Sequence, residues 1–276
     1  SLIRYTNTSS ASMRSARCLL LVVLQEFTNA CKGRVQGSSC PNRTAGQLEA
    51  RALAARFKGD ARIFGYSTLD EPSGSADWPK QLYETLKAED PARPVLLNLG
   101  CDGWAPLNVT GPLVQASDIA SIDPYVDYTK PGVPSWQVND PFNSNSVRTV
   151  ATAMDYLQTT ITAGSRAGGN KPRQSLAVLA SLRSNADPKG KWNATFRYAT
   201  ASEVRAEAFV AINHGAQGIL YWPGVSHTFR TVAPGLWEGL AEVAQDVQSL
   251  APMVLAPLRS TDALPVIASA QSVDLG

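Results

Sequence analysis

A chain of 276 residues, 44% hydrophobic and 17% charged, is long enough to bury one large core or two modest ones. Its formal net charge of +2 produces no long-range field that would single out nucleic acid or an anionic membrane as a partner. No apolar run approaches the roughly 20 residues that a membrane-spanning helix needs. We therefore expect a globular protein without a membrane span or a nucleic-acid partner, and the oligomeric state stays open.

The first apolar segment allows two interpretations. Residues 13–17 are basic and small, and the apolar run 18–24 follows them, which is the order found in a secretory signal. The same run is equally typical of a buried strand. Because it is short and the polar pair Gln25-Glu26 interrupts it, we favour the strand. Residues 1–17 are then expected to be a disordered N-terminal extension.

Strand and helix patterns alternate after this segment. Thr44 and Gln47 form a capping-box pattern that begins a predicted helix over 44–58. Further strands are predicted at 63–71, 95–99, 118–125, 176–182 and 218–224. Helical periodicity predicts helices near 81–86, 147–161, 201–215 and 236–250, the third of them capped by Thr200 and Glu203. Such alternation with short connections indicates a parallel sheet of βαβ units.

This count of six strands falls short of a closed barrel. A TIM-type (β/α) barrel has eight strands and takes about 250 residues. We therefore predict an α/β fold with an incomplete TIM-type barrel of about six β/α units over 18–251. Residues 252–276, which include Pro257 and Pro265, are predicted to form an extended tail, either on its own or as the start of a β-domain.

Two adjacent carboxylates end the most informative segment, residues 64–72. The apolar and aromatic run there finishes in Asp70, Glu71 and Pro72, and the strand must stop at a proline, which cannot donate to the sheet ladder. Since α/β barrels place catalytic groups at the carboxyl ends of their strands, Glu71 is a candidate catalytic acid. An Asp-Pro ending without any chemistry is the alternative. Asp123 and Tyr125 follow a later strand in the same way.

The ordered set of strand ends resembles the (β/α)8 glycoside hydrolases of the retaining clan, over about residues 19–250. In this resemblance Glu71, within Leu69-Asp70-Glu71-Pro72, matches the general acid/base after strand four. Tyr125 matches the aromatic residue after strand six, and Trp222 the strand-eight tryptophan under the sugar ring. The resemblance implies that the first two strands are lacking and that the substrate is a β-linked oligosaccharide or polysaccharide. The sequence contains neither a dinucleotide-binding glycine fingerprint nor a Walker loop, so no cofactor is expected.

The chain departs from the family pattern at two positions. Asp70 stands where the clan usually has asparagine, and such a like charge would raise the pKa of Glu71, which suits a general acid. The strand-seven end, within 177–185, has no carboxylate where the nucleophile belongs. A retaining mechanism needs two carboxyl groups about 5 Å apart. Asp123 is therefore a candidate second carboxylate that positions water in an inverting scheme, and a plain Asp-Pro strand end is its alternative.

A carbohydrate ligand needs polar groups and aromatic rings around the acid. The candidates at the strand ends are Asp70, Asn98, Asp102, Trp104, Tyr125 and Trp222. Glu203 is predicted to cap a helix rather than to replace the nucleophile. The missing nucleophile favours a competing interpretation, in which the chain is a catalytically inactive barrel with a carbohydrate-binding or structural role.

Cysteines and glycosylation sequons indicate the compartment. Cys31 and Cys40 flank a Gly/Ser-rich stretch and could close a loop, and the four cysteines lack the paired short spacing of a zinc site, so no metal is predicted. Asn-x-Ser/Thr sequons occur at Asn7, Asn42, Asn108 and Asn193. Together these features predict a secreted or luminal glycoprotein.

Overall fold

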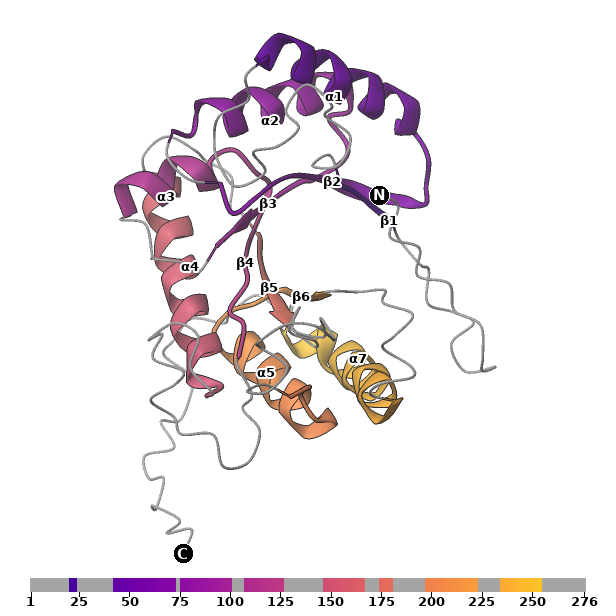
Figure 1. Ribbon diagram of the computed structural model, residues 1–276, viewed down its shortest axis with the longest axis vertical. Helices are drawn as coiled ribbons and strands as arrows, with labels where there is room; N and C mark the ends of the chain where they lie inside the picture. The colour runs from indigo at the N-terminus through magenta and orange to yellow at the C-terminus, as the bar shows by residue number, and fades with distance from the viewer. Residues whose placement is uncertain are drawn as a thin grey trace, which may run out of the picture.

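The computed structural model describes residues 20–23, 42–72, 75–100, 107–126, 146–166, 174–180, 197–222 and 234–254. Six parallel strands form one sheet whose spatial order follows the chain: β1 (Leu20–Val23), β2 (Ile63–Asp70), β3 (Val95–Leu99), β4 (Ile119–Ile122), β5 (Gln174–Ala180) and β6 (Gly218–Trp222). The strands curve into an arc, and the helices lie on its convex side (Figure 1).

The helices follow the strands in strict alternation along most of the chain. They are α1 (Arg43–Phe57), α2 (Asp77–Glu89), α3 (Leu107–Val114), α4 (Arg148–Arg166), α5 (Ala201–Asn213) and α7 (Pro234–Val254). Within the described residues, no helix combines the length and the apolar character that crossing a membrane requires. The predicted parallel sheet of six β/α units is confirmed. Among the described strands β1 and β6 do not pair, and the incomplete TIM-type barrel stays a prediction.

Several element ends differ from the sequence-based expectations. The N-cap of α1 is Asn42, whose side-chain oxygen accepts the Ala45 N–H at 3.1 Å, so the capping box predicted at Thr44 is wrong. Asparagine is as good a cap as threonine and lies two residues earlier. Helix α3 was not predicted, because it contains Gly111 and Pro112. Helix α7 continues to Val254, past the point where an extended tail was expected from residue 252.

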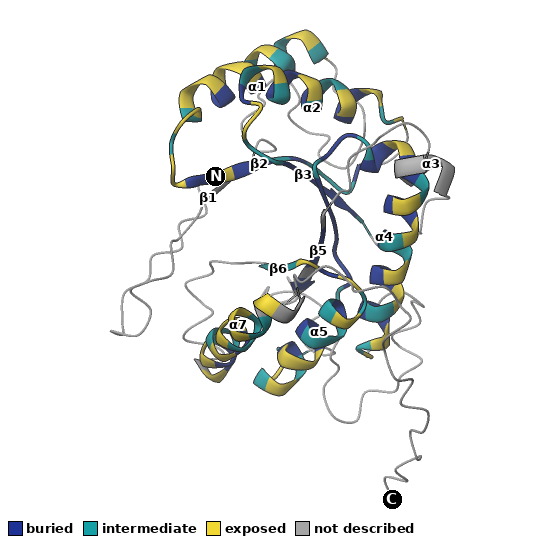
Figure 2. Ribbon diagram, turned by 180° about the vertical axis from the view of Figure 1, so that it is seen from behind, coloured by how far each residue is buried: buried dark blue, intermediate teal, exposed yellow. Residues whose placement is uncertain are grey.

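Two hydrophobic clusters fill the space between the helices and the sheet. The smaller cluster joins α1 and α2 to β2 through Tyr66, Trp78 and Leu86, together with Val95 at the start of β3. The larger cluster joins α3, α4, α5 and α7 to strands β3, β4 and β5. Leu69, near the end of β2, packs against both clusters. Figure 2 shows the buried residues of the helices turned toward the sheet and the exposed ones turned outward.

A buried polar contact anchors the smaller cluster. The Tyr66 hydroxyl donates to Asp90 Oδ2 at 2.8 Å and lies 3.3 Å from the carbonyl oxygen of Ala54. Tyr66 and Asp90 are both buried. Since a buried carboxylate without a donor is costly, this hydroxyl ties the end of α2 to the middle of β2.

Alternation along the central strands separates packed from polar side chains. Leu97 and Leu99 on β3, and Ala120 and Ile122 on β4, belong to the larger cluster on the convex side. Because successive side chains of a strand point to opposite faces, the residues between them face the concave side of the arc. Asn98 and Ser121 are buried residues of this concave face, which therefore becomes polar toward the carboxyl ends of the strands.

Candidate active site at the carboxyl edge of the sheet

Three strand ends meet at one edge because the strands are parallel. Asp70 at the end of β2 is in register with Asn98 on β3, which is in register with Ser121 on β4. The register shifts between Ser67 and Asp70, which marks a bulge near the end of β2. This register brings Asp70 close to Asn98 and to the carboxyl group of Asp123.

Glu71 has an unusual backbone conformation. Its φ of 46° makes it the one non-glycine residue with a positive φ in the described part of the chain. Its N–H donates to the carbonyl oxygen of Asn98 at 3.0 Å. Such a conformation costs a bulky residue on the order of 1–3 kcal/mol and is found preferentially at functional sites. The bend turns the Glu71 side chain away from the direction that a continuing strand would give it.

Gly100 leaves the space that the Glu71 side chain occupies. A Cβ atom at position 100 would lie 2.9 Å from Cγ, 3.0 Å from Cβ and 3.1 Å from Cδ of Glu71. These distances are shorter than normal van der Waals contacts, so any larger residue would displace the glutamate. The observed position of the Glu71 side chain therefore requires glycine at position 100, directly after β3.

The amide of Asn98 links two carboxylates. Its Nδ2 donates to Asp70 Oδ1 at 2.8 Å and to Asp123 Oδ2 at 3.2 Å. Its Oδ1 accepts the hydroxyl proton of Ser121 at 2.9 Å. Because the serine hydroxyl donates to the oxygen, the amide nitrogen is oriented toward the two acids.

Asp123 is a buried acid whose pKa is strongly raised. Its side chain is 2% exposed. Burial, the hydrogen bond with Glu71 and the charges of Glu71 and Asp70 raise the pKa of Asp123 from 3.8 to about 9, against the hydrogen bond from Asn98. Burial and the neighbouring charges, led by that of Asp123, also raise the pKa of Tyr125, which hydrogen-bonds to Asp123. Perturbed acids at the edge of a parallel sheet are typical of catalytic sites.

The structure brings five of the predicted site residues together: Asp70, Glu71, Asn98, Asp123 and Tyr125. Trp222 ends β6 at the same edge of the sheet, and its side chain lies outside the described part, as do Asp102 and Trp104. Sequence reasoning missed Gly100 and Ser121. Gly100 directly follows a strand, which is a usable signal for close approach, whereas a serine within a strand carries none.

The contact between Glu71 and Asp123 differs from the arrangement expected for two catalytic carboxylates. A hydrogen bond with Glu71 is one of the causes that raise the pKa of Asp123, so the two side chains are in direct contact. Retaining glycosidases hold their carboxyl groups about 5 Å apart and inverting ones about 6.5–9.5 Å apart. A direct hydrogen bond is a shorter separation than either mechanism uses.

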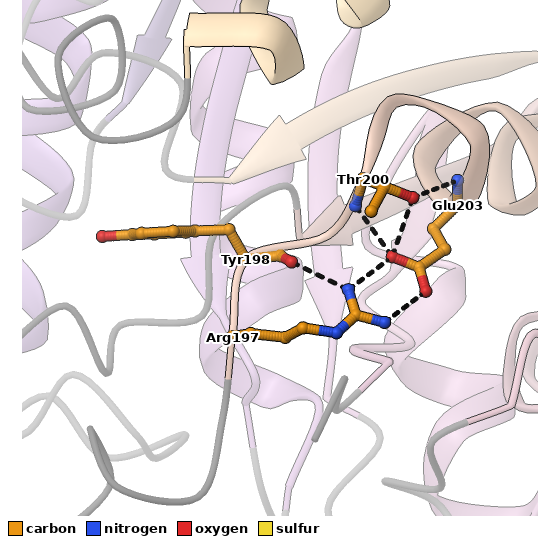
Figure 3. A network of polar contacts seen from close by, with 4 residues as sticks. All are labelled: Arg197, Tyr198, Thr200 and Glu203. Atoms are coloured by element: carbon orange, nitrogen blue, oxygen red, sulfur yellow. Dashed lines mark hydrogen bonds and ion pairs between the residues drawn. The ribbon is translucent and has the colours of Figure 1, made fainter. Parts of the chain in front are cut away.

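Glu203 has a structural role at the start of α5, as predicted. Figure 3 shows the side chain of Glu203 between Arg197 and Thr200. Arg197 donates to both carboxylate oxygens at 2.5 and 2.7 Å, and the reciprocal capping box with Thr200 is complete. The hydrogen bond from Arg197 is the main cause that lowers the pKa of Glu203. A carboxylate used in this way is not the missing nucleophile.

Solved structures of glycoside hydrolases share this fold. The β-galactosidase of Marinomonas ef1 is 14% identical with a TM-score of 0.55, and the match covers 80% of this chain and 44% of that one. For the β-galactosidase of Bacillus circulans sp. alkalophilus the identity is 16%, the TM-score 0.52 and the coverage 79% and 41%. For that of Rahnella sp. R3 the values are 15%, 0.51, 79% and 40%.

No protein-family model matches the sequence, and no curated protein matches it either. The chain spans less than half of the length of these three β-galactosidases. At such low identities the likeness shows the fold alone. The chain therefore has a glycoside hydrolase-like fold, and what it does has to be inferred from the cluster at its sheet edge.

Proposed function

We propose that this chain hydrolyses β-linked glycosides and that Glu71 is the general acid/base. The observation that carries the proposal is the strained Glu71, held at φ 46° at the carboxyl end of β2 and hydrogen-bonded to the buried Asp123. Folding retains such strain only where surrounding contacts enforce it. The fold shared with β-galactosidases supports a β-linked substrate.

In this proposal Glu71 protonates the glycosidic oxygen while the bond from that oxygen to the sugar carbon breaks, so the leaving group departs as an alcohol. Asp70 and Tyr125 border the acid and are proposed to orient the sugar. Trp222, Trp104 and Asp102 are proposed to complete the subsite, with the aromatic rings stacking on apolar sugar faces. A secreted or luminal location is part of the same proposal.

The alternative is a catalytically inactive barrel that binds carbohydrate. Two observations favour it. The segment 177–185 contains no carboxylate, and Asp123 contacts Glu71 directly instead of standing opposite it across a substrate. In this case the cluster at the sheet edge binds sugar hydroxyls and transfers no proton.

Hydrolysis of a panel of aryl β-glycosides by the wild type and by Glu71→Gln tests the proposal. The panel includes a poor leaving group, because a good one needs little help from an acid. Removing the general acid is expected to lower the rate by about 100- to 10,000-fold. Glu84→Gln, the same chemical change on the exposed side of α2 where Glu84 pairs with Lys80, is the matched control and should keep full activity.

A folded wild type that hydrolyses nothing on this panel would refute the hydrolase proposal. Calorimetric titration with β-linked oligosaccharides then decides on the alternative. Binding that Glu71→Gln weakens and Glu84→Gln leaves unchanged would support a carbohydrate-binding role.

A further inference from the structure

Asp123 is buried against other acids, and within the described part of the chain no ion pair of Asp123 with a basic residue is found. Glu71 and Asp70 face it from the end of β2, Asn98 from β3 and Tyr125 from its own strand end. Strand β5, on its other side, carries no charged residue in its sequence. Among the described groups that influence Asp123, none is a cation. Two carboxylates in hydrogen-bond contact repel each other unless they share a proton.

From this geometry we infer that Asp123 is a positioning residue, which stays protonated at neutral pH and donates a hydrogen bond to one carboxyl oxygen of Glu71, so that the other oxygen of Glu71 is the one that carries and transfers the proton of the acid step. The inference deepens the proposed function and rests on it for the role of Glu71. It differs from the sequence-based hypothesis that Asp123 is a second catalytic carboxylate. At 2% exposure Asp123 is buried behind Glu71 in this proposal and is not assigned a contact with the sugar carbon or with an attacking water.

The burial of the two acids indicates which one stays neutral while the other gains and gives up the proton of the acid step. Asp123 is 2% exposed, whereas Glu71 is half-buried, and a negative charge is less costly on the more exposed group. Oδ2 of Asp123 already accepts from Asn98. Its Oδ1 is buried and receives no hydrogen bond from the described residues. A proton on Oδ1 converts this atom from an acceptor without a donor into a donor toward Glu71.

Ser121 and Asn98 fix the orientation of this pair. The Asn98 nitrogen faces Asp70 and Asp123, and the Ser121 hydroxyl, 2.9 Å from Asn98 Oδ1 and 3.3 Å from the carbonyl oxygen of Leu97, is in place to donate to the amide oxygen. Asp123 Oδ2 is thereby fixed as an acceptor, and Oδ1 is the oxygen left to carry the proton. The arrangement needs a neutral side chain with one acceptor and one donor at position 123.

Asparagine has the same shape and the same donor and acceptor as a protonated aspartic acid. Asp123→Asn is therefore expected to fold, to retain the contact with Glu71 and to keep its activity within a few-fold of the wild type. Asp123→Ala removes the donor and is expected to lose activity at constant substrate affinity, because Glu71 is no longer positioned. A catalytic carboxylate at position 123 would instead make Asp123→Asn as inactive as Glu71→Gln, which would overturn the inference.

A measurement without catalysis tests the proton itself. A carboxyl whose pKa is raised on folding keeps a proton that the unfolded chain has lost, so stability falls as the pH rises between the two pKa values, here about 4 and about 9. The urea midpoint of the wild type should therefore decrease across this range relative to that of Asp123→Asn, in which position 123 does not titrate. Parallel curves for the two proteins would overturn the inference.

The matched control is Asp77→Asn, which removes an exposed carboxyl at the start of α2. Its stability curve should remain parallel to that of the wild type. If the wild type hydrolyses no glycoside, the proposed function fails, and the difference between the wild-type and Asp123→Asn stability curves still shows whether Asp123 holds a proton. The two failures are therefore distinguishable.

Discussion

Replacing Glu71 by glycine and by alanine tests whether its backbone is strained. Both changes remove the carboxylate and its contact with Asp123, and they differ only in the Cβ atom at a φ of 46°. A left-handed backbone costs a residue with a Cβ about 1–2 kcal/mol, and glycine loses about 0.5–1 kcal/mol more chain entropy on folding than alanine. Glu71→Gly should therefore be more stable than Glu71→Ala by about 0.5–1 kcal/mol.

The sign of this difference is the informative result, because at ordinary helix and strand positions glycine is the less stable residue. Glu84 in α2 provides the matched pair. There Glu84→Gly should be less stable than Glu84→Ala by about 1 kcal/mol. Urea unfolding of the four variants gives both differences. If alanine proves more stable than glycine at position 71 as well, the backbone of Glu71 is not strained and the main support for its functional role is lost.

Two further substitutions probe contacts next to the site and in the smaller cluster. Gly100→Ala places a Cβ atom 2.9 Å from Glu71 Cγ and should reduce kcat on the glycoside panel far more than it reduces stability. The control is Gly111→Ala, whose new Cβ atom has nothing within 4 Å. Equal activity of the two variants would contradict the packing argument. Tyr66→Phe removes the hydroxyl that donates to the buried Asp90, and it should lower the free energy of unfolding by about 1–3 kcal/mol. An unchanged thermal midpoint would show that water replaces this donor.

The strand ends were predictable because local chemistry determines them. Pro72 ends β2 after a run of apolar and aromatic residues, and Asp123 follows a short buried strand. Parallel pairing then brings the acids to one edge, which the alternation of strands and helices already indicated. Thr200 and Glu203 were likewise predictable as a capping box, since both partners lie within one helical turn.

The direct contact between Glu71 and Asp123 was not predictable, because it depends on a positive φ at one residue and on empty space above Gly100. The positive φ leaves no pattern in a single sequence, and a glycine after a strand indicates close approach without naming the side chain that fills the space. Helix α3 was missed for a related reason, since its glycine and proline have low helix propensity and tertiary packing of Leu113 and Val114 overrides it. Burial likewise decides the state of Asp123, and burial is a property of the folded arrangement.

The candidate site lies across the boundary between the two hydrophobic clusters. Asp70 and Glu71 follow β2, which the smaller cluster holds, whereas Asn98 and Asp123 belong to strands that the larger cluster holds. Since proteins open in cooperative units below the global unfolding free energy, the smaller cluster can detach while the larger one stays intact. Heat would then inactivate the protein before most of its helical circular-dichroism signal is lost. A ligand that contacts residues of both clusters would stabilise the smaller cluster against detachment and so protect the amides of α1 and α2 from hydrogen exchange.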